Sequence, residues 1–162
     1  MISLDAMEKE IVVLGCGNVL FGDDGFGSSV AEHLQADCVL PTNVSVVNAG
    51  TSVRGILFDL ILREEKPKKI IVVDAVDMER APGRIFRISL EELPCNKVDD
   101  FTLHEMPTIN LLRELRDLCR VEVIILAGQI ESIPETVRPG LSETLSKSVE
   151  VAAEQVLKLC SS

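Results

Sequence analysis

Apolar and polar residues alternate along this chain in blocks that predict strands separated by amphipathic helices. Short apolar runs predict buried strands at residues 11–14, 44–48, 69–74 and 121–127. The run at 69–74 is apolar on both faces, which is typical of a central strand in a parallel sheet. A less regular pattern at residues 84–88 predicts one further strand, antiparallel to the others.

Between these runs, apolar residues recur every three or four positions, as they do on one face of an α-helix. This spacing predicts helices at residues 24–35, 52–65, 108–120 and 141–159. Strands that alternate with helices predict an α/β fold, a three-layer α/β/α sandwich around a twisted, mostly parallel (mixed) sheet of about five strands. No linker or internal repeat divides the 162 residues, so a single domain, 1–162, is expected.

Length and charge exclude several classes of function. The longest apolar runs have about six residues, whereas a membrane helix needs about 20, so no membrane insertion is expected. The N-terminal residues are charged and lack the apolar stretch of a signal peptide, which predicts a cytoplasmic protein. The net charge is −10 and there is no Trp or Tyr, which argues against a nucleic-acid partner.

Residues 15–27, which read GCGNVLFGDDGFG, carry the clearest functional signal. A glycine-rich turn after a strand and before a helix is where α/β folds place ligands. The adjacent acids Asp23 and Asp24 would repel a phosphate and attract a cation. Gly15 and Gly17 begin a dinucleotide-binding pattern, but Leu20 stands where its third glycine belongs. A nucleotide-binding enzyme therefore remains an alternative, weakened by both features.

Two further residues extend this candidate site. Asp74 ends the third predicted strand, and His104 lies in a loop before a helix. Because the carboxyl ends of parallel strands share one edge, Asp24 and Asp74 can converge there. Two carboxylates and an imidazole suit a borderline metal such as zinc or nickel, and three ligands leave positions for water or substrate. Each residue alone also fits a structural role, with Asp23 or Asp24 as a helix cap.

Cysteine chemistry is not indicated. The five cysteines are spread singly and form no CxxC pair, which supports neither a disulfide framework nor a zinc ribbon. Cys16 lies in the glycine-rich turn, but no His is near it in the sequence. No Ser-His-Asp or Cys-His triad is evident either.

The ordered motifs resemble those of the hydrogenase maturation endopeptidases, which process the large subunits of nickel–iron hydrogenases. The motifs lie at residues 17–27, at Asn48-Ala-Gly-Thr, at residues 73–76 with Ala81-Pro-Gly, and around His104, and the resemblance spans residues 11–159. It implies an α/β/α fold and three residues that are catalytic and contact metal: Asp24, Asp74 and His104. In some relatives the first acid is Glu, which is longer by one methylene.

The resemblance also implies a reaction and a partner. A metal-dependent endopeptidase removes a C-terminal extension from the large-subunit precursor after nickel insertion. The nickel arrives with the substrate, so no permanent cofactor is expected. The motif around His104 looks most like the branch that serves deazaflavin (coenzyme F420)-reducing hydrogenases of methane-forming archaea. A non-catalytic module that binds the precursor in a nickel-dependent way is the second alternative.

Overall fold

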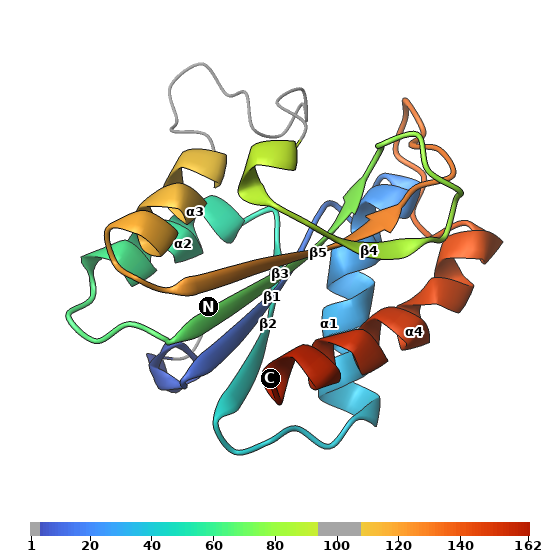
Figure 1. Ribbon diagram of the computed structural model, residues 1–162. Coiled ribbons are helices and arrows are strands. Elements are labelled where there is room, and N and C mark those ends of the chain that lie inside the picture. Colours follow the sequence, from blue (N-terminus) through green and yellow to red (C-terminus); the bar gives the residue numbers. More distant parts are fainter. Residues whose placement is uncertain (1–3, 94–107) are drawn as a thin grey trace.

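A five-stranded sheet separates two layers of helices in the computed structural model, which describes residues 4–93 and 108–162 (Figure 1). The strands are β1 (Ile11–Cys16), β2 (Val44–Gly50), β3 (Lys69–Val76), β4 (Ile85–Ile88) and β5 (Glu122–Gln129). The helices are α1 (Phe26–Asp37), α2 (Val53–Leu62), α3 (Thr108–Asp117) and α4 (Glu143–Cys160). Short 3-10 turns are η1 (Leu4–Glu8), η2 (Gly22–Gly25) and η3 (Leu90–Glu92). The predicted three-layer α/β fold is confirmed.

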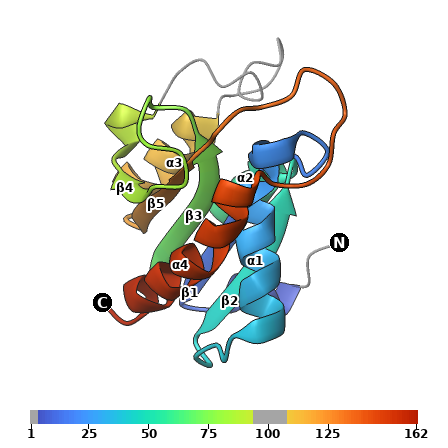
Figure 2. The same cartoon turned by 90° about the vertical axis from the view of Figure 1, so that its right-hand side faces the viewer.

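The strand order is β2-β1-β3-β5-β4. Strands β2, β1, β3 and β5 are parallel to one another. Strand β4 runs antiparallel to β5, as the weaker pattern at residues 84–88 predicted. The carboxyl ends of β1, β2, β3 and β5 therefore meet at one edge of the sheet. Helices α1 and α4 cover one face, and α2 and α3 cover the other (Figures 1 and 2).

The hydrophobic core has two halves because the central strands are buried on both faces. In β1, Val12 and Leu14 pack on the side of α2 and α3, while Val13 packs on the side of α1 and α4. All three side chains are fully buried. This two-sided burial explains why the central strands read as continuous apolar runs. Within the parts of the chain that the structure describes, no helix is long and apolar enough to cross a membrane.

The start of the first helix differs from the prediction. The predicted helix begins at Asp24, but residues Gly22–Gly25 form η2 and the α-helix begins at Phe26. Its N-cap is Gly25, and no side chain caps it. The interpretation of Asp23 or Asp24 as a cap of this helix is therefore wrong, because the Asp24 carboxylate accepts the N–H of Asn18 and the Asp23 carboxylate accepts that of Glu131.

The motif ends in glycine because there is no room for a side chain at position 27. A Cβ at this position would lie 2.1 Å from the carbonyl oxygen of Val73 and 2.3 Å from that of Cys16. Glycine thus lets the first turn of α1 rest directly on the ends of β1 and β3. This contact places η2, and the acids it carries, over the carboxyl edge of the sheet.

Lys69 ties the first residue of β3 to the last turn of α4. Its buried Nζ donates to the carbonyl oxygens of Leu159 and Ser162, both at 2.8 Å, and lies 3.6 Å from Oε2 of Glu122. We expect Lys69→Met to lower Tm by about 2–4 °C, since an apolar chain of similar size fills the space but leaves about 1 kcal/mol of hydrogen bonding unmade.

Thermal unfolding followed by circular dichroism checks this expectation. The matched control is Lys68→Met, because the Lys68 side chain is 80% exposed and its ion pair with Glu10 is worth little. Equal Tm values for the two variants would show that the contacts of Lys69 do not stabilise the fold.

Candidate active site

Asp24 and Asp74 meet at Gly17, just after the end of β1. A Cβ at Gly17 would fall 1.9 Å from the carbonyl oxygen of Asp24 and 3.6 Å from Oδ1 of Asp74. The φ angle of Gly17 is +126°, a conformation that favours glycine. The structure therefore brings the main chain of Asp24 and the side chain of Asp74 against the same residue, and a Cβ there would clash with the carbonyl of Asp24.

The two acids come from different elements. Asp24 belongs to η2, beyond the end of β1. Asp74 lies within β3, opposite Ala127 of β5, so it precedes the end of that strand by two residues. Its place on a central strand surrounded by packed neighbours gives it a fixed position, whereas Asp24 depends on the conformation of its loop.

Hydrogen bonds from the loop backbone orient the Asp24 carboxylate. Its Oδ2 accepts the N–H of Asn18 at 3.0 Å, and Oδ1 of Asn18 accepts the N–H of Leu20 at 3.0 Å. Asp24 is buried, with 6% of its surface exposed, while Asp74 is partly buried and its Oδ1 accepts the N–H of Ala75 at 2.8 Å. The acids are thus oriented by the protein itself, and a loop N–H that a phosphate would need is already bound to a carboxylate.

Asp23 faces a different part of the molecule. It is 1% exposed, and its carboxylate accepts the N–H of Glu131 at 2.9 Å, the N–H of Ser142 at 2.7 Å and the hydroxyl of Ser142 at 3.0 Å. Ser142 also caps α4 by accepting the N–H of Leu145. Asp23 therefore joins the glycine-rich turn to the start of α4, a role that sequence analysis missed.

Residues 131–142, called here the docked loop, lie along the glycine-rich turn. The N–H of Gly22 donates to the carbonyl of Arg138 at 2.9 Å, and the N–H of Arg138 donates to the carbonyl of Leu20 at 2.8 Å. A Cβ at Gly22 would lie 2.9 Å from Cδ of Pro134. Figure 2 shows the docked loop, in orange, beside the blue turn that precedes α1. With Asp23, these contacts hold two segments distant in sequence as one unit.

The end of β2 supports the site from the other side. The N–H of Gly17 donates to the carbonyl of Gly50 at 3.0 Å, and Gly50 has a φ of +54°. The motif Asn48-Ala-Gly-Thr thus forms the last three residues of β2 and the residue after them, and Ser52 is the N-cap of α2. Its position next to Gly17 keeps it close to the acids.

His104, the third predicted ligand, lies outside the described residues, so its contact with metal stays a prediction. Over 4–93 and 108–162, no group of three or more His, Cys, Asp and Glu side chains could hold a metal ion. Asp24 and Asp74 are the two predicted ligands that the structure describes, and each offers carboxylate oxygens. His33 lies on α1, with Nδ1 3.1 Å from a carboxylate oxygen of Asp37. Among the described residues, no imidazole therefore joins the two acids in such a group.

Cys16, Cys38 and Cys160 do not fit a nucleophile. Cys16 is buried and its thiol donates to the carbonyl of Leu14. Burial raises the pKa of the Cys38 and Cys160 thiols above the ordinary value, which keeps them protonated at neutral pH. The interpretation of the cysteines as separate structural residues agrees with these surroundings.

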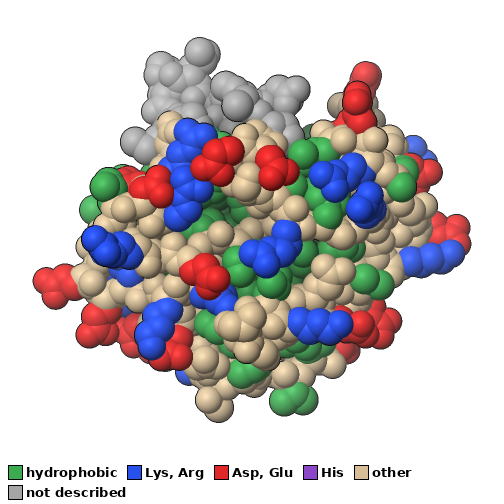
Figure 3. Space-filling view, in the orientation of Figure 1, with side chains coloured by type: hydrophobic (Ala, Val, Ile, Leu, Met, Phe, Trp, Pro, Cys, Tyr) green, Lys and Arg blue, Asp and Glu red, His purple; other side chains and the backbone are tan. Residues whose placement is uncertain are grey.

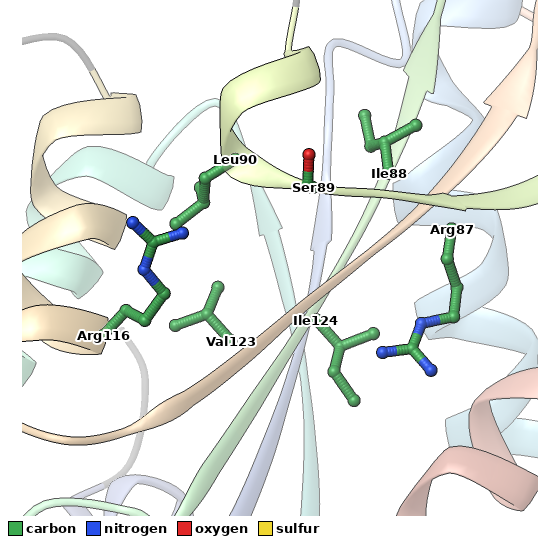
Figure 4. Close-up of a pocket in the computed structure, with 7 residues that line it drawn as sticks. All are labelled: Arg87, Ile88, Ser89, Leu90, Arg116, Val123 and Ile124. Carbon is green, nitrogen blue, oxygen red and sulfur yellow. The ribbon is translucent and has the colours of Figure 1, made fainter.

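A hollow beside β4 and β5 is separate from the acids (Figure 4). Its volume is about 270 Å³, and no carboxylate or imidazole lines it. Its lining residues are Arg87, Ile88, Ser89, Leu90, Arg116, Val123 and Ile124. Arg116 is bound to Glu91 and Asp117, so this hollow does not offer the chemistry of a cation site. On the face shown in Figure 3, acidic and basic side chains are interspersed and no basic stripe is visible.

Comparison with known proteins gives one consistent family. The family model described as hydrogenase maturation protease matches residues 28–159. A protein of Methanocaldococcus jannaschii with the provisional name of hydrogenase maturation protease is 41% identical over 152 residues, which cover 93% of this chain and 96% of the relative. The coenzyme F420 hydrogenase subunit delta of Methanothermobacter thermautotrophicus is 33% identical, over 93% of this chain and 94% of its own.

Solved structures agree. The hydrogenase maturating endopeptidase HybD from E. coli superposes with a TM-score of 0.70 at 27% identity, covering 92% of this chain and 90% of its own. The resemblance stated from the motifs is thereby confirmed along almost the whole chain.

Proposed function

The chain belongs to the hydrogenase maturation protease family and is an endopeptidase, and we propose that it removes a C-terminal extension from the large-subunit precursor of a nickel–iron hydrogenase. The observation that carries this proposal beyond the family match is that the main chain of Asp24 and Oδ1 of Asp74 both lie at Gly17, on the carboxyl edge of the sheet, while the N–H of Asn18 in the same loop orients the Asp24 carboxylate.

We further propose that these acids, with His104 as the third ligand, contact nickel that the precursor carries. Nickel belongs to the substrate here, so the protease needs no metal of its own. Carboxylate and imidazole ligands suit this ion, and an incompletely coordinated nickel accepts them. Nickel in this position can polarise a carbonyl or lower the pKa of a bound water, in addition to marking the precursor as loaded.

As the substrate we propose the precursor of a deazaflavin-reducing hydrogenase, in line with the motif around His104. One relative, 33% identical over nearly its whole length, is named as a subunit of the coenzyme F420 hydrogenase. That precursor is the first one to test with this protein.

The geometry weakens the two alternatives unequally. A nucleotide-binding enzyme needs loop N–H groups for phosphate, but the N–H of Asn18 is bound to Asp24 and two buried acids lie in the same loop. A non-catalytic, nickel-dependent binding module uses the same acids, and only a cleavage assay separates it from a protease.

Intact mass spectrometry of the precursor, nickel-loaded and nickel-free, tests the proposal. We expect the loaded form to lose one discrete C-terminal fragment after incubation with this protein, and the nickel-free form to keep its mass. The control is a relative known to cut the same sample.

Each other outcome contradicts a stated part of the proposal. Cleavage of both forms would contradict nickel recognition. Unchanged mass of both forms, where the relative cuts the loaded one, would contradict this choice of precursor or support the binding module.

A further inference from the structure

Four exposed apolar side chains gather where the docked loop meets the glycine-rich turn. Val19, Leu20, Ile133 and Val137, called here the apolar flank, are 48%, 46%, 44% and 62% exposed. Each lies within one residue of a contact between the two segments: Leu20 bonds to Arg138, which follows Val137, and Pro134, which follows Ile133, lies against Gly22. Single exposed apolar residues are common, but a group contributed by two segments marks an interaction surface.

The apolar flank is connected to the candidate site by a short chain of hydrogen bonds. Asp24 accepts the N–H of Asn18, Asn18 accepts the N–H of Leu20, and Leu20 accepts the N–H of Arg138. The buried carboxylate of Asp23 fixes both ends of the docked loop, at Glu131 and Ser142. The flank is therefore held in a constant position relative to Asp24, as a surface that aligns a substrate has to be.

We propose that the apolar flank binds an apolar, extended segment of the hydrogenase large-subunit precursor next to the bond that is cleaved. This inference rests on the proposed function and deepens it, because it assigns a docking surface outside the acids. The occupant follows from the position of the flank beside the site. A substrate chain whose scissile bond lies near Asp24 passes over the neighbouring surface within a few residues of that bond. Each residue of an extended chain spans only about 3.3 Å.

A second copy of this protein is the competing occupant of the same surface. A dimer formed through the apolar flank would cover the segments next to Asp24 and obstruct a macromolecular substrate. The position of the flank beside the acids therefore favours the precursor over a second copy.

Steady-state cleavage of the nickel-loaded precursor by Val137→Asp tests the inference. Val137 is 62% exposed, so an aspartate there leaves the fold intact but places a charge against the apolar segment. We expect KM to rise about tenfold or more while kcat stays within about twofold, which is the signature of weakened binding away from the reacting atoms. Val137→Leu restores an apolar surface and should keep the KM of the wild type.

The matched control is Val151→Asp, since Val151 is exposed to a comparable extent, 48%, but lies on α4. A KM of Val137→Asp equal to that of Val151→Asp overturns the docking surface, and so does a fall in kcat at constant KM. Loss of a wild-type dimer in Val137→Asp, measured by light scattering with KM unchanged, would assign the flank to a second copy. If the wild type does not cleave the precursor at all, the proposed function fails instead.

Discussion

Asp74→Asn is expected to lower kcat/KM for the nickel-loaded precursor at least about 100-fold, while Tm stays within about 2 °C of the wild type. The substitution keeps the size of the side chain and an oxygen that can accept the N–H of Ala75. It removes the negative charge beside Gly17, which is the property that a cation site requires. Release of the C-terminal fragment, followed by mass spectrometry over time, measures the effect.

Asp77→Asn is the matched control for this experiment. Asp77 is an exposed carboxylate three positions further along the chain, and it accepts an N–H from Gln129 rather than taking part in the acid pair. Activity of Asp74→Asn equal to that of Asp77→Asn would remove Asp74 from the site. A pull-down of nickel-loaded precursor by each variant then separates recognition from cleavage.

Asp24→Asn and His104→Ala should lower kcat/KM for the nickel-loaded precursor, as Asp74→Asn does. The three substitutions remove one proposed ligand each from the same ion, so their effects should be far from additive when two are combined. Normal cleavage by both single variants would contradict the assignment of these residues.

The sequence was sufficient for the fold because the relevant signals are local and repeated. The central strands are buried on both faces, so β1 and β3 appear as unbroken apolar runs, and the helices keep the spacing of one buried face. The antiparallel strand β4 was predicted from a weaker pattern, and its short pairing with β5 confirms it. These features depend on neighbours close in the chain, which is the information that periodicity carries.

The candidate site was predictable only in part. The convergence of Asp24 and Asp74 followed from the rule that parallel strands share a carboxyl edge, and both residues do lie against Gly17. The ligand roles of the acids and of His104 came from their residue types near strand ends and from the family resemblance, and they remain predictions. The helix start was misplaced because the acids that resembled a cap are used elsewhere.

Asp23 shows why the remainder could not be predicted. Its hydrogen-bond partners, Glu131 and Ser142, are 108 and 119 positions away in the chain. Nothing in the spacing of adjacent acids distinguishes the one whose carboxylate is bound by Asn18 from the one whose carboxylate is bound by the docked loop. Only the packing of α4 beside α1 brings the partners of Asp23 within hydrogen-bond distance.

Asp23→Ala is therefore expected to be the most destabilising substitution of an acid in the glycine-rich turn. It leaves two backbone N–H groups and the hydroxyl of Ser142 without their buried acceptor. Bonds to a charged acceptor are worth more than neutral ones, but water can reach part of the released loop, so the loss is about 3 kcal/mol. For a protein of this size the expected fall in Tm is about 6–12 °C.

The same substitution should also reduce cleavage, because the docked loop and the apolar flank are fixed relative to Asp24 through Asp23. Asp59→Ala, which removes an exposed carboxylate from α2, controls for the loss of charge and should change neither Tm nor activity. A Tm of Asp23→Ala equal to that of Asp59→Ala would show that the main-chain bonds to Arg138 hold the loop without the carboxylate. A lower Tm with full activity at a temperature where the variant is folded would show instead that Asp23 stabilises the protein without positioning the site.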